Sequence, residues 1–223
     1  MTYRLNFGQT ITPITYVWYI EGVRERILVD AGASAQYFST VRGVPASSIQ
    51  TLESGLDKLG ISFNDIDLVI LTQLHHDHVS EAFRFTKAKF IVQQSELEFA
   101  KRPHPSVAAM YNGEFFDKLD FEVISGDTQI CDEIWALSTP GHTPGGQSVS
   151  VKTAKGTAII AGLCTILENY DPPSPIKGLM PVITPGIHTN VLEAYDSLIR
   201  IKEIADLIVP LHEPTFQQKS CIP

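Results

Sequence analysis

The chain has 223 residues, and its 17 Lys and Arg against 25 Asp and Glu give a formal net charge of -8. This acidic balance argues against duplex nucleic acid or an anionic membrane as the main partner, because phosphates are neutralised by Lys and Arg. With 43% hydrophobic and 19% charged residues, the composition excludes a disordered chain. A chain of this length can bury one sizeable core, so we expect a single α/β domain over residues 1–223.

The sequence lacks the long apolar segment of a membrane span or a secretion signal. The longest apolar runs, such as Leu68–Leu71 and Ala158–Ala161, fall far short of the roughly 20 residues that cross a bilayer. The first residues lack the apolar core of a signal peptide. We therefore expect a cytoplasmic protein whose three cysteines, Cys131, Cys164 and Cys221, are thiols rather than disulfide partners.

The first half of the chain alternates strand and helix patterns. Tyr16–Ile20 and Arg26–Asp30 are β-branched and aromatic runs around a short polar turn, which predicts a hairpin. Ser48–Leu59 has apolar residues at helical spacing and is followed by Gly60, a natural helix stop. Asp67–Thr72 is a continuous apolar run, typical of a strand that is buried on both faces.

The second half is richer in strand patterns. A stretch of 14 residues, 172–185, holds five of the 14 prolines, so we expect an ordered loop or lid there. The remaining predicted helices are Ser95–Lys101 and Val191–Ile204, and the remaining predicted strands are Lys89–Gln93, Phe121–Ile124, Ile130–Leu137, Ser148–Val151, Thr157–Ala161 and Leu207–His212.

A cluster of histidines follows the buried strand directly. His75, His76 and His78 lie within four residues that also contain Asp77. In α/β proteins, chemistry concentrates in the loops that strand ends feed. Neutral imidazoles and a carboxylate suit zinc and similar divalent ions. The competing interpretation is a polar surface loop.

Two single histidines stand at similar positions later in the chain. His142 lies in the turn-rich segment Thr139–Gly146, and His212 ends the last predicted strand. Loops from separate strands can aim such side chains at one point. Together with the cluster, these residues predict a metal site.

The combined motifs resemble the metallo-β-lactamase superfamily, and above all its small lactonase-type members of the N-acyl homoserine lactonase type. The resemblance spans roughly residues 15 to 215 and rests on four segments: Leu28–Gly32, Thr72–His78, Thr139–Gly145 and Ile208–His212. It implies an αββα sandwich with the metal in a cleft at the sheet edges. The aspartate of the first segment, Asp30, is expected to fix the metal loop through hydrogen bonds.

Two positions depart from the family pattern. Gln73 stands where the family has the first histidine of its H-x-H-x-D-H motif. Leu163 stands where the family has an aspartate that bridges two metal ions, or Cys164 does if the register shifts by one residue. A thiolate at Cys164 would be a ligand, and the alternative is a buried core thiol. His76 is the variable position of the motif, so we expect it to be exposed or to act indirectly.

The resemblance sorts the remaining side chains into two sites. The first would comprise Gln73, His75 and His142, and it is impaired because a neutral amide oxygen is a weak ligand for zinc. The second retains Asp77, His78 and His212. We therefore expect one divalent ion in the second site, with zinc favoured over manganese or iron, and with Cys164 or water completing the ligands. The candidate metal-ligating residues are His75, Asp77, His78, His142, His212 and Cys164.

The resemblance implies a metal-dependent hydrolase that opens a small lactone or a related cyclic ester or amide. Asp77 would accept the proton of the attacking water, and His75 or His142 would orient it. The alternative is a non-hydrolytic metal-binding relative, either a small-molecule sensor or an iron redox enzyme. We expect a small-molecule substrate as the partner, and neither nucleic acid nor membrane. The sequence leaves open whether the chain forms a homodimer.

Overall fold

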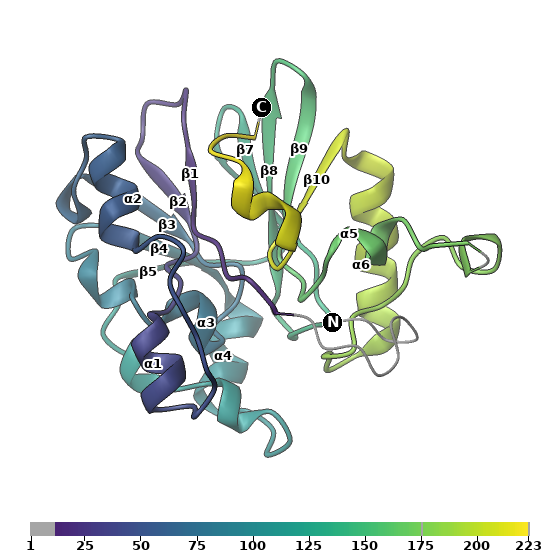
Figure 1. Cartoon of the computed structure of the whole chain (residues 1–223), viewed down its shortest axis with the longest axis horizontal. Helices are drawn as coiled ribbons and strands as arrows, with labels where there is room; N and C mark the ends of the chain where they lie inside the picture. The colour runs from purple at the N-terminus through teal and green to yellow at the C-terminus, as the bar shows by residue number, and fades with distance from the viewer. Residues whose placement is uncertain (1–11, 175, 223) are drawn as a thin grey trace. The chain divides into compact units, whose positions relative to one another are not determined.

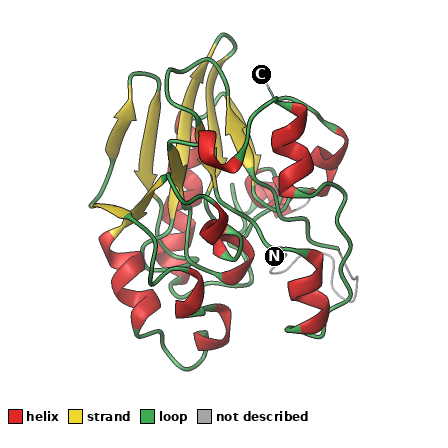
Figure 2. Cartoon of the chain, turned by 90° about the vertical axis from the view of Figure 1, so that its left-hand side faces the viewer, coloured by secondary structure: helices red, strands yellow, loops and turns green. Residues whose placement is uncertain are grey.

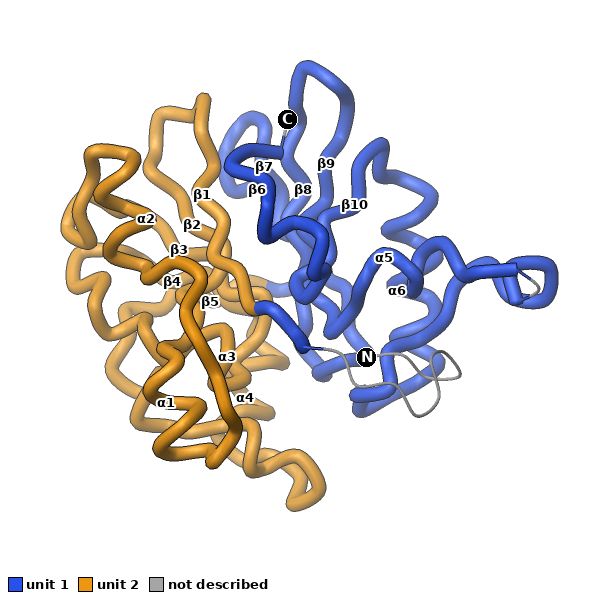
Figure 3. Tube along the Cα trace, in the orientation of Figure 1, with its two compact units in different colours: residues 1–14, 125–223 blue, residues 15–124 orange. Residues whose placement is uncertain are grey.

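The computed structural model describes residues 12–174 and 176–222. The chain divides into two compact units, shown in different colours in Figure 3. The N-terminal unit is Thr15–Ile124, and the C-terminal unit is Ser125–Pro223 together with Met1–Ile14. Each unit contains its own five-stranded sheet. The expectation of a single domain stays a prediction.

The sheet of the N-terminal unit has the strand order β1-β2-β3-β4-β5. Its strands are β1 (Trp18–Ile20), β2 (Ile27–Val29), β3 (Leu68–Ile70), β4 (Lys89–Gln93) and β5 (Phe121–Ile124), labelled in Figure 1. β1 and β2 form the predicted antiparallel hairpin, and β2 to β5 run parallel. Because parallel strands end at the same edge of a sheet, the segments that follow β2, β3 and β4 meet there.

Four α-helices accompany this sheet: α1 (Ala35–Thr40), α2 (Leu52–Lys58), α3 (His76–Val79) and α4 (Gln94–Lys101). α2 begins four residues later than the predicted start at Ser48, because the Thr51 hydroxyl caps it by accepting the Ser54 backbone N–H at 3.1 Å. The apolar pattern of the sequence predicts neither α1 nor α3. The core of this unit includes Leu28, Val69, Leu71, Phe85 and Phe90.

The sheet of the C-terminal unit has the order β10-β9-β8-β7-β6. Its strands are β6 (Thr128–Cys131), β7 (Ile134–Ser138), β8 (Gln147–Thr153), β9 (Gly156–Ala161) and β10 (Leu207–Pro210). The prediction of one strand over Ile130–Leu137 is wrong, because the chain turns at Asp132 and Glu133 and pairs β6 with β7 as a hairpin. β6 to β9 are antiparallel neighbours, and β10 joins β9 in parallel.

The described residues of the C-terminal unit form two α-helices, α5 (Leu167–Tyr170) and α6 (Val191–Ile204). α6 has the predicted bounds, and the Asn190 side chain caps it by accepting the Leu192 backbone N–H. The described residues of 172–185, which exclude residue 175, form mostly loop, as predicted, with one short 3-10 turn at Ile176–Gly178. Figure 2 shows how loops connect the short elements. Within the described ranges, none of the helices has the length and apolar character needed to cross a membrane.

Candidate metal site

The histidine cluster lies at the carboxyl end of β3, in the N-terminal unit. α3 begins at His76, and the preceding residue, His75, has extended backbone angles. His75, His76 and His78 are 3%, 5% and 1% exposed, whereas Asp77 is partly exposed. Three imidazoles and a carboxylate are therefore concentrated at one sheet edge and largely withdrawn from bulk water. Charges interact more strongly in such a buried environment than in water.

Asp30, which follows β2, is fully buried and holds the histidine loop. Its carboxylate accepts hydrogen bonds from the Thr72 backbone N–H at 2.7 Å and from the Thr72 hydroxyl at 2.9 Å. His78 Nδ1 lies 2.8 Å from Asp30 Oδ2. Asp30 has a φ of +62°, in the left-handed region that residues other than glycine rarely adopt. The expectation that Asp30 holds this loop through hydrogen bonds is confirmed, and metal binding by the loop stays a prediction.

The Asp30 carboxylate also determines which nitrogen of His78 can bind a metal. Because His78 donates its Nδ1 proton to Asp30, the ring presents Nε2, which lies 3.3 Å from Asp77 Oδ2. Burial by itself lowers the pKa of His78, but the carboxylates of Asp77 and Asp30 outweigh burial and raise this pKa to about 10. The two carboxylates therefore favour a positive charge at this point, whether a proton or a metal ion supplies it.

A second buried carboxylate, which sequence reasoning missed, supports the same loop. Glu96 in α4 is fully buried, and its Oε1 accepts the Leu74 backbone N–H at 3.0 Å and the Tyr111 hydroxyl at 3.4 Å. The Tyr111 ring packs edge-on against the His75 ring, with centroids 4.7 Å apart. Burial and the Glu96 carboxylate raise the pKa of Tyr111, so the phenol stays protonated and acts as a donor. The sequence signal was weak: a glutamate in the first turn after a buried strand.

Gln73 differs from its neighbours because its side-chain amide is unsatisfied. The residue is fully buried, and neither Oε1 nor Nε2 makes a hydrogen bond within the described part of the chain. A buried polar group without a partner costs about 1–3 kcal/mol, and folded proteins keep few of them. This position therefore has the desolvated, polar character of a group that meets an ion or a substrate.

The side chain of His76 is buried rather than exposed. Its ring is buried beside two aromatic side chains of α1, with ring centroids 5.5 Å from Tyr37 and 5.7 Å from Phe38. Burial lowers the pKa of His76, which favours the neutral ring. Of the two alternatives for His76, exposure is wrong because side chains of the unpredicted helix α1 cover this position, and the indirect role stays a prediction.

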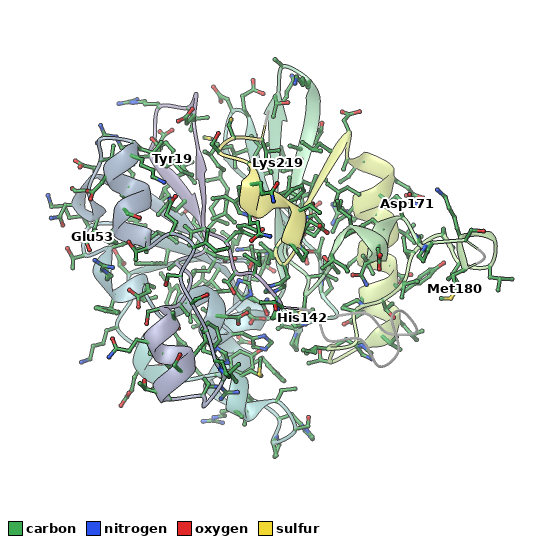
Figure 4. The ribbon with its side chains drawn as sticks, in the orientation of Figure 1. Tyr19, Glu53, His142, Asp171, Met180 and Lys219 are labelled. Carbon is green, nitrogen blue, oxygen red and sulfur yellow. The ribbon has the colours of Figure 1, made fainter. Side chains whose placement is uncertain are left out.

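In the C-terminal unit, His142 lies in the turn Thr139–Gly146 and is labelled in Figure 4. Gly141 has a φ of +120°, and a Cβ atom there would lie 2.1 Å from the Ala194 backbone nitrogen, so glycine is required for the turn to approach α6. His142 Nδ1 lies 2.8 Å from the Ile187 carbonyl oxygen. The ring donates its proton there, which makes Nε2 the nitrogen that can bind a metal or a substrate.

His212 follows β10, and backbone groups fix its ring in the same manner. Its Nδ1 lies 3.0 Å from the Ile14 carbonyl oxygen, and its backbone N–H donates to the Thr165 carbonyl oxygen at 3.3 Å. The second contact places His212 beside the segment that carries Cys164. Both His142 and His212 therefore have the arrangement of ligand histidines, in which one ring nitrogen donates within the protein and the other binds.

The segment after β9 contains no carboxylate. Leu163 is fully buried in an apolar cluster with Val182 and Leu198. Cys164 is 7% exposed, and none of the chain's three cysteines, all of them described, forms a disulfide. Leu163 is a core residue that offers no ligand atom.

Each unit brings part of the candidate set together. His75, Asp77 and His78 lie at the start of α3 in the N-terminal unit. In the C-terminal unit, β7, β9 and β10 run in the same direction, so the segments after them meet at one edge of the sheet. Those three segments carry the other candidates, which are His142, Cys164 and His212.

Comparisons with known proteins identify the family of this chain. The model of the metallo-beta-lactamase superfamily matches residues 12–210. N-acyl homoserine lactonase AiiA of Bacillus thuringiensis subsp. kurstaki is 27% identical over 177 residues, which are 74% of this chain and 63% of that protein. N-acyl homoserine lactonase AttM of Rhizobium radiobacter is 33% identical over 170 residues, which are 70% of this chain and 61% of that protein. The matches thus span less than two thirds of these relatives.

A solved structure supports the fold independently. The crystal structure of a quorum-quenching N-acyl homoserine lactone lactonase is similar with a TM-score of 0.75 and 26% sequence identity, over 98% of this chain and 87% of that one. The metallo-β-lactamase fold implied by the sequence motifs is therefore confirmed. With the family model matching nearly the whole described chain and with lactonases among its relatives, the chain belongs to the metallo-β-lactamase superfamily.

Proposed function

We propose that this protein is a metal-dependent hydrolase that opens a small lactone or a related cyclic ester or amide. Its family membership and its lactonase relatives support this activity. The observation that carries the proposal is the bonded series Asp30–His78–Asp77, in which two carboxylates flank one buried imidazole. Such a grouping attracts a cation, because two carboxylates beside one imidazole favour a positive charge there.

The residues present fit a divalent ion. The ligands we propose are Asp77, His78 and His212, with Cys164 or a water molecule as the fourth. In His78 and His212 the Nδ1 atom is already engaged with a protein oxygen, which directs binding to Nε2. Imidazole with carboxylate is a donor set that zinc accepts readily, and manganese or iron are the alternatives.

We propose that one ion is bound rather than two. Leu163 supplies no bridging carboxylate, and a shared anionic ligand is what holds two cations close together. Gln73 offers only a neutral amide where a histidine would complete the first site. His75 and His142 then bind substrate or water instead of sharing an ion.

Asp77, His78 and His212 would hold the ion, which would supply a Lewis acid and would bring the pKa of a bound water to about 7. The protein groups do the rest of the chemistry. Asp77 accepts the proton of the attacking water, whose oxygen bonds to the acyl carbon. His75 or His142 orients that water. When the ring C–O bond breaks, the leaving alkoxide takes the proton from Asp77, and the product is a hydroxy acid.

Two measurements on protein purified without a metal-chelating tag test this proposal. Elemental analysis should find one ion per chain, and two ions at full occupancy would contradict the single site. A panel of lactones, cyclic amides, thioesters and β-lactams, assayed with the zinc, manganese and iron forms, should reveal ring opening that chelation abolishes.

The two changed positions, Gln73 and Leu163, favour one second candidate. This is a non-hydrolytic relative that binds a metal and a small molecule as a sensor, or that uses iron for redox chemistry. A fully metallated protein that is inactive on the whole panel would support it over the hydrolase.

A further inference from the structure

Gln73 is the residue whose structure the proposed function does not yet explain. Its amide is fully buried, and both Oε1 and Nε2 are unsatisfied within the described residues. Gln147, in β8, is an equally buried glutamine whose amide atoms are not among the unsatisfied ones. Burial alone therefore does not leave a glutamine of this protein without hydrogen bonds.

The backbone on both sides of Gln73 is held in place. The Asp30 carboxylate accepts the Thr72 N–H at 2.7 Å, and the Glu96 carboxylate accepts the Leu74 N–H at 3.0 Å. Both carboxylates are fully buried. These charge-assisted bonds are strong, and they fix the backbone on both sides of Gln73.

We propose that the Gln73 amide Nε2 donates a hydrogen bond to the carbonyl oxygen of the substrate, and that it stabilises the negative charge that grows there during attack. This proposal rests on the proposed function. An amide N–H is neutral and electropositive, so it cannot bind a cation but can bind an oxyanion. Gln73 is two positions from His75, to which the proposed function assigns the binding of substrate or water.

The chemistry assigns Gln73 no proton transfer. As the water oxygen bonds to the acyl carbon, the carbonyl π electrons move to the oxygen, and the Nε2–H bond to that oxygen strengthens. When the ring C–O bond breaks, those electrons return and the hydrogen bond weakens again. Such a fixed donor acts on the transition state more than on the bound substrate. In a site with one ion, it supplies part of the carbonyl polarisation that a second ion would give.

The test compares the wild type with Gln73→Met, which keeps the side-chain length and removes both amide groups. We expect kcat for lactone opening to fall by about 10²–10³, with little change in KM and with the same metal content by elemental analysis. We also expect the Tm of the metal-free variant to rise by about 2–4 °C, because an unsatisfied buried amide is replaced by an apolar group. Gln147→Met, the matched control for Tm, should lower it.

Three results would overturn the proposed role of Gln73 and leave the proposed hydrolase function standing. An unchanged kcat in Gln73→Met would show that the Gln73 amide is not a hydrogen-bond donor to the substrate. A fall of its metal content below that of the wild type makes Oε1 a metal ligand instead. A fall of its Tm, as in the control, means that the amide is satisfied in the free protein. A wild type that opens none of the cyclic substrates overturns the proposed function itself, and this role with it.

Discussion

Asp30 Oδ2 and His78 Nδ1 lie 2.8 Å apart, although 48 positions of sequence separate the two residues. The parallel pairing of β2 with β3 makes this contact, because the segment after each strand reaches the same sheet edge. A carboxylate behind a ligand histidine fixes the tautomer and makes the ring a better ligand.

Replacing the Asp30 carboxylate should therefore weaken metal binding without removing a metal ligand. We expect Asp30→Asn to lower the affinity for the ion by about 10–100-fold. Competition with a chelator of known affinity measures this change. Asp57→Asn, at an exposed position of α2, is the matched control and should bind the ion as the wild type does. Equal affinity in both variants would show that Asp30 does not support the ligand.

A second prediction separates ligands from neighbours. His212→Ala should remove the ion, whereas His76→Ala should retain it, as elemental analysis can show. His76→Ala should nevertheless lower the free energy of unfolding by about 1–3 kcal/mol, because its ring packs against Tyr37 and Phe38. Full metal content in His212→Ala would instead move the ion to the site of Gln73, His75 and His142.

Cys164 offers a third test. Cys164→Ser replaces the thiol by a hydroxyl of similar shape that is a much poorer ligand for zinc. If the thiolate completes the metal site, the variant should release the ion to a chelator at a clearly lower chelator concentration. An unchanged affinity assigns Cys164 to the core, where the hydroxyl should cost some stability instead.

The sequence predicted those candidate site residues that are close together in the chain or lie in turns rich in proline and glycine. His75, Asp77 and His78 are within four positions, and His142 is framed by prolines and glycines. Glu96 escaped prediction because its burial depends on α4 packing beside the loop after β3. Nothing in its own segment distinguishes it from an exposed helical glutamate.

The fold was predictable to a similar extent. Strands with continuous apolar runs, such as β3 and β4, and the long amphipathic helix α6 were predicted close to their bounds. α1 was not, because its two largest apolar side chains, Tyr37 and Phe38, are adjacent and give no helical period. β6 and β7 were merged because their two-residue turn, Asp132 and Glu133, lacks glycine or proline.

The ion pair between Asp127 and Arg200 gives a pH prediction that is independent of the metal. Arg200 hydrogen-bonds both carboxylate oxygens and outweighs burial, so it lowers the pKa of Asp127 in the folded protein. Because the pKa of Asp127 is lower in the folded than in the unfolded protein, its ionised form stabilises the fold. This stabilisation is fully present above roughly pH 4, the ordinary pKa of aspartate, and it is lost as the pH falls through the pKa of the folded state. Both side chains are 38% exposed, so the pair contributes only about 0.2–1 kcal/mol.

Urea unfolding of the wild type and Asp127→Asn at several pH values checks this. The variant should be the less stable at pH 7, and the difference should shrink as pH falls below about 4. Asp132→Asn, an exposed position in the turn between β6 and β7, is the control and should show no such trend. A difference between wild type and Asp127→Asn that persists at low pH would point to packing rather than to the charge.

The last prediction concerns Asp77, to which we assign both metal binding and proton transfer. Asp77→Asn keeps an oxygen that can coordinate the ion but cannot accept a proton at neutral pH. It should lower kcat by about 10²–10⁴, the usual contribution of a positioned acid or base, even when excess metal restores one ion per chain. Asp77→Ala removes the oxygen as well and should lose the ion. If Asp77→Asn recovers wild-type kcat once the metal is restored, Asp77 is a ligand alone, and the proton must go to another group such as His75 or His142.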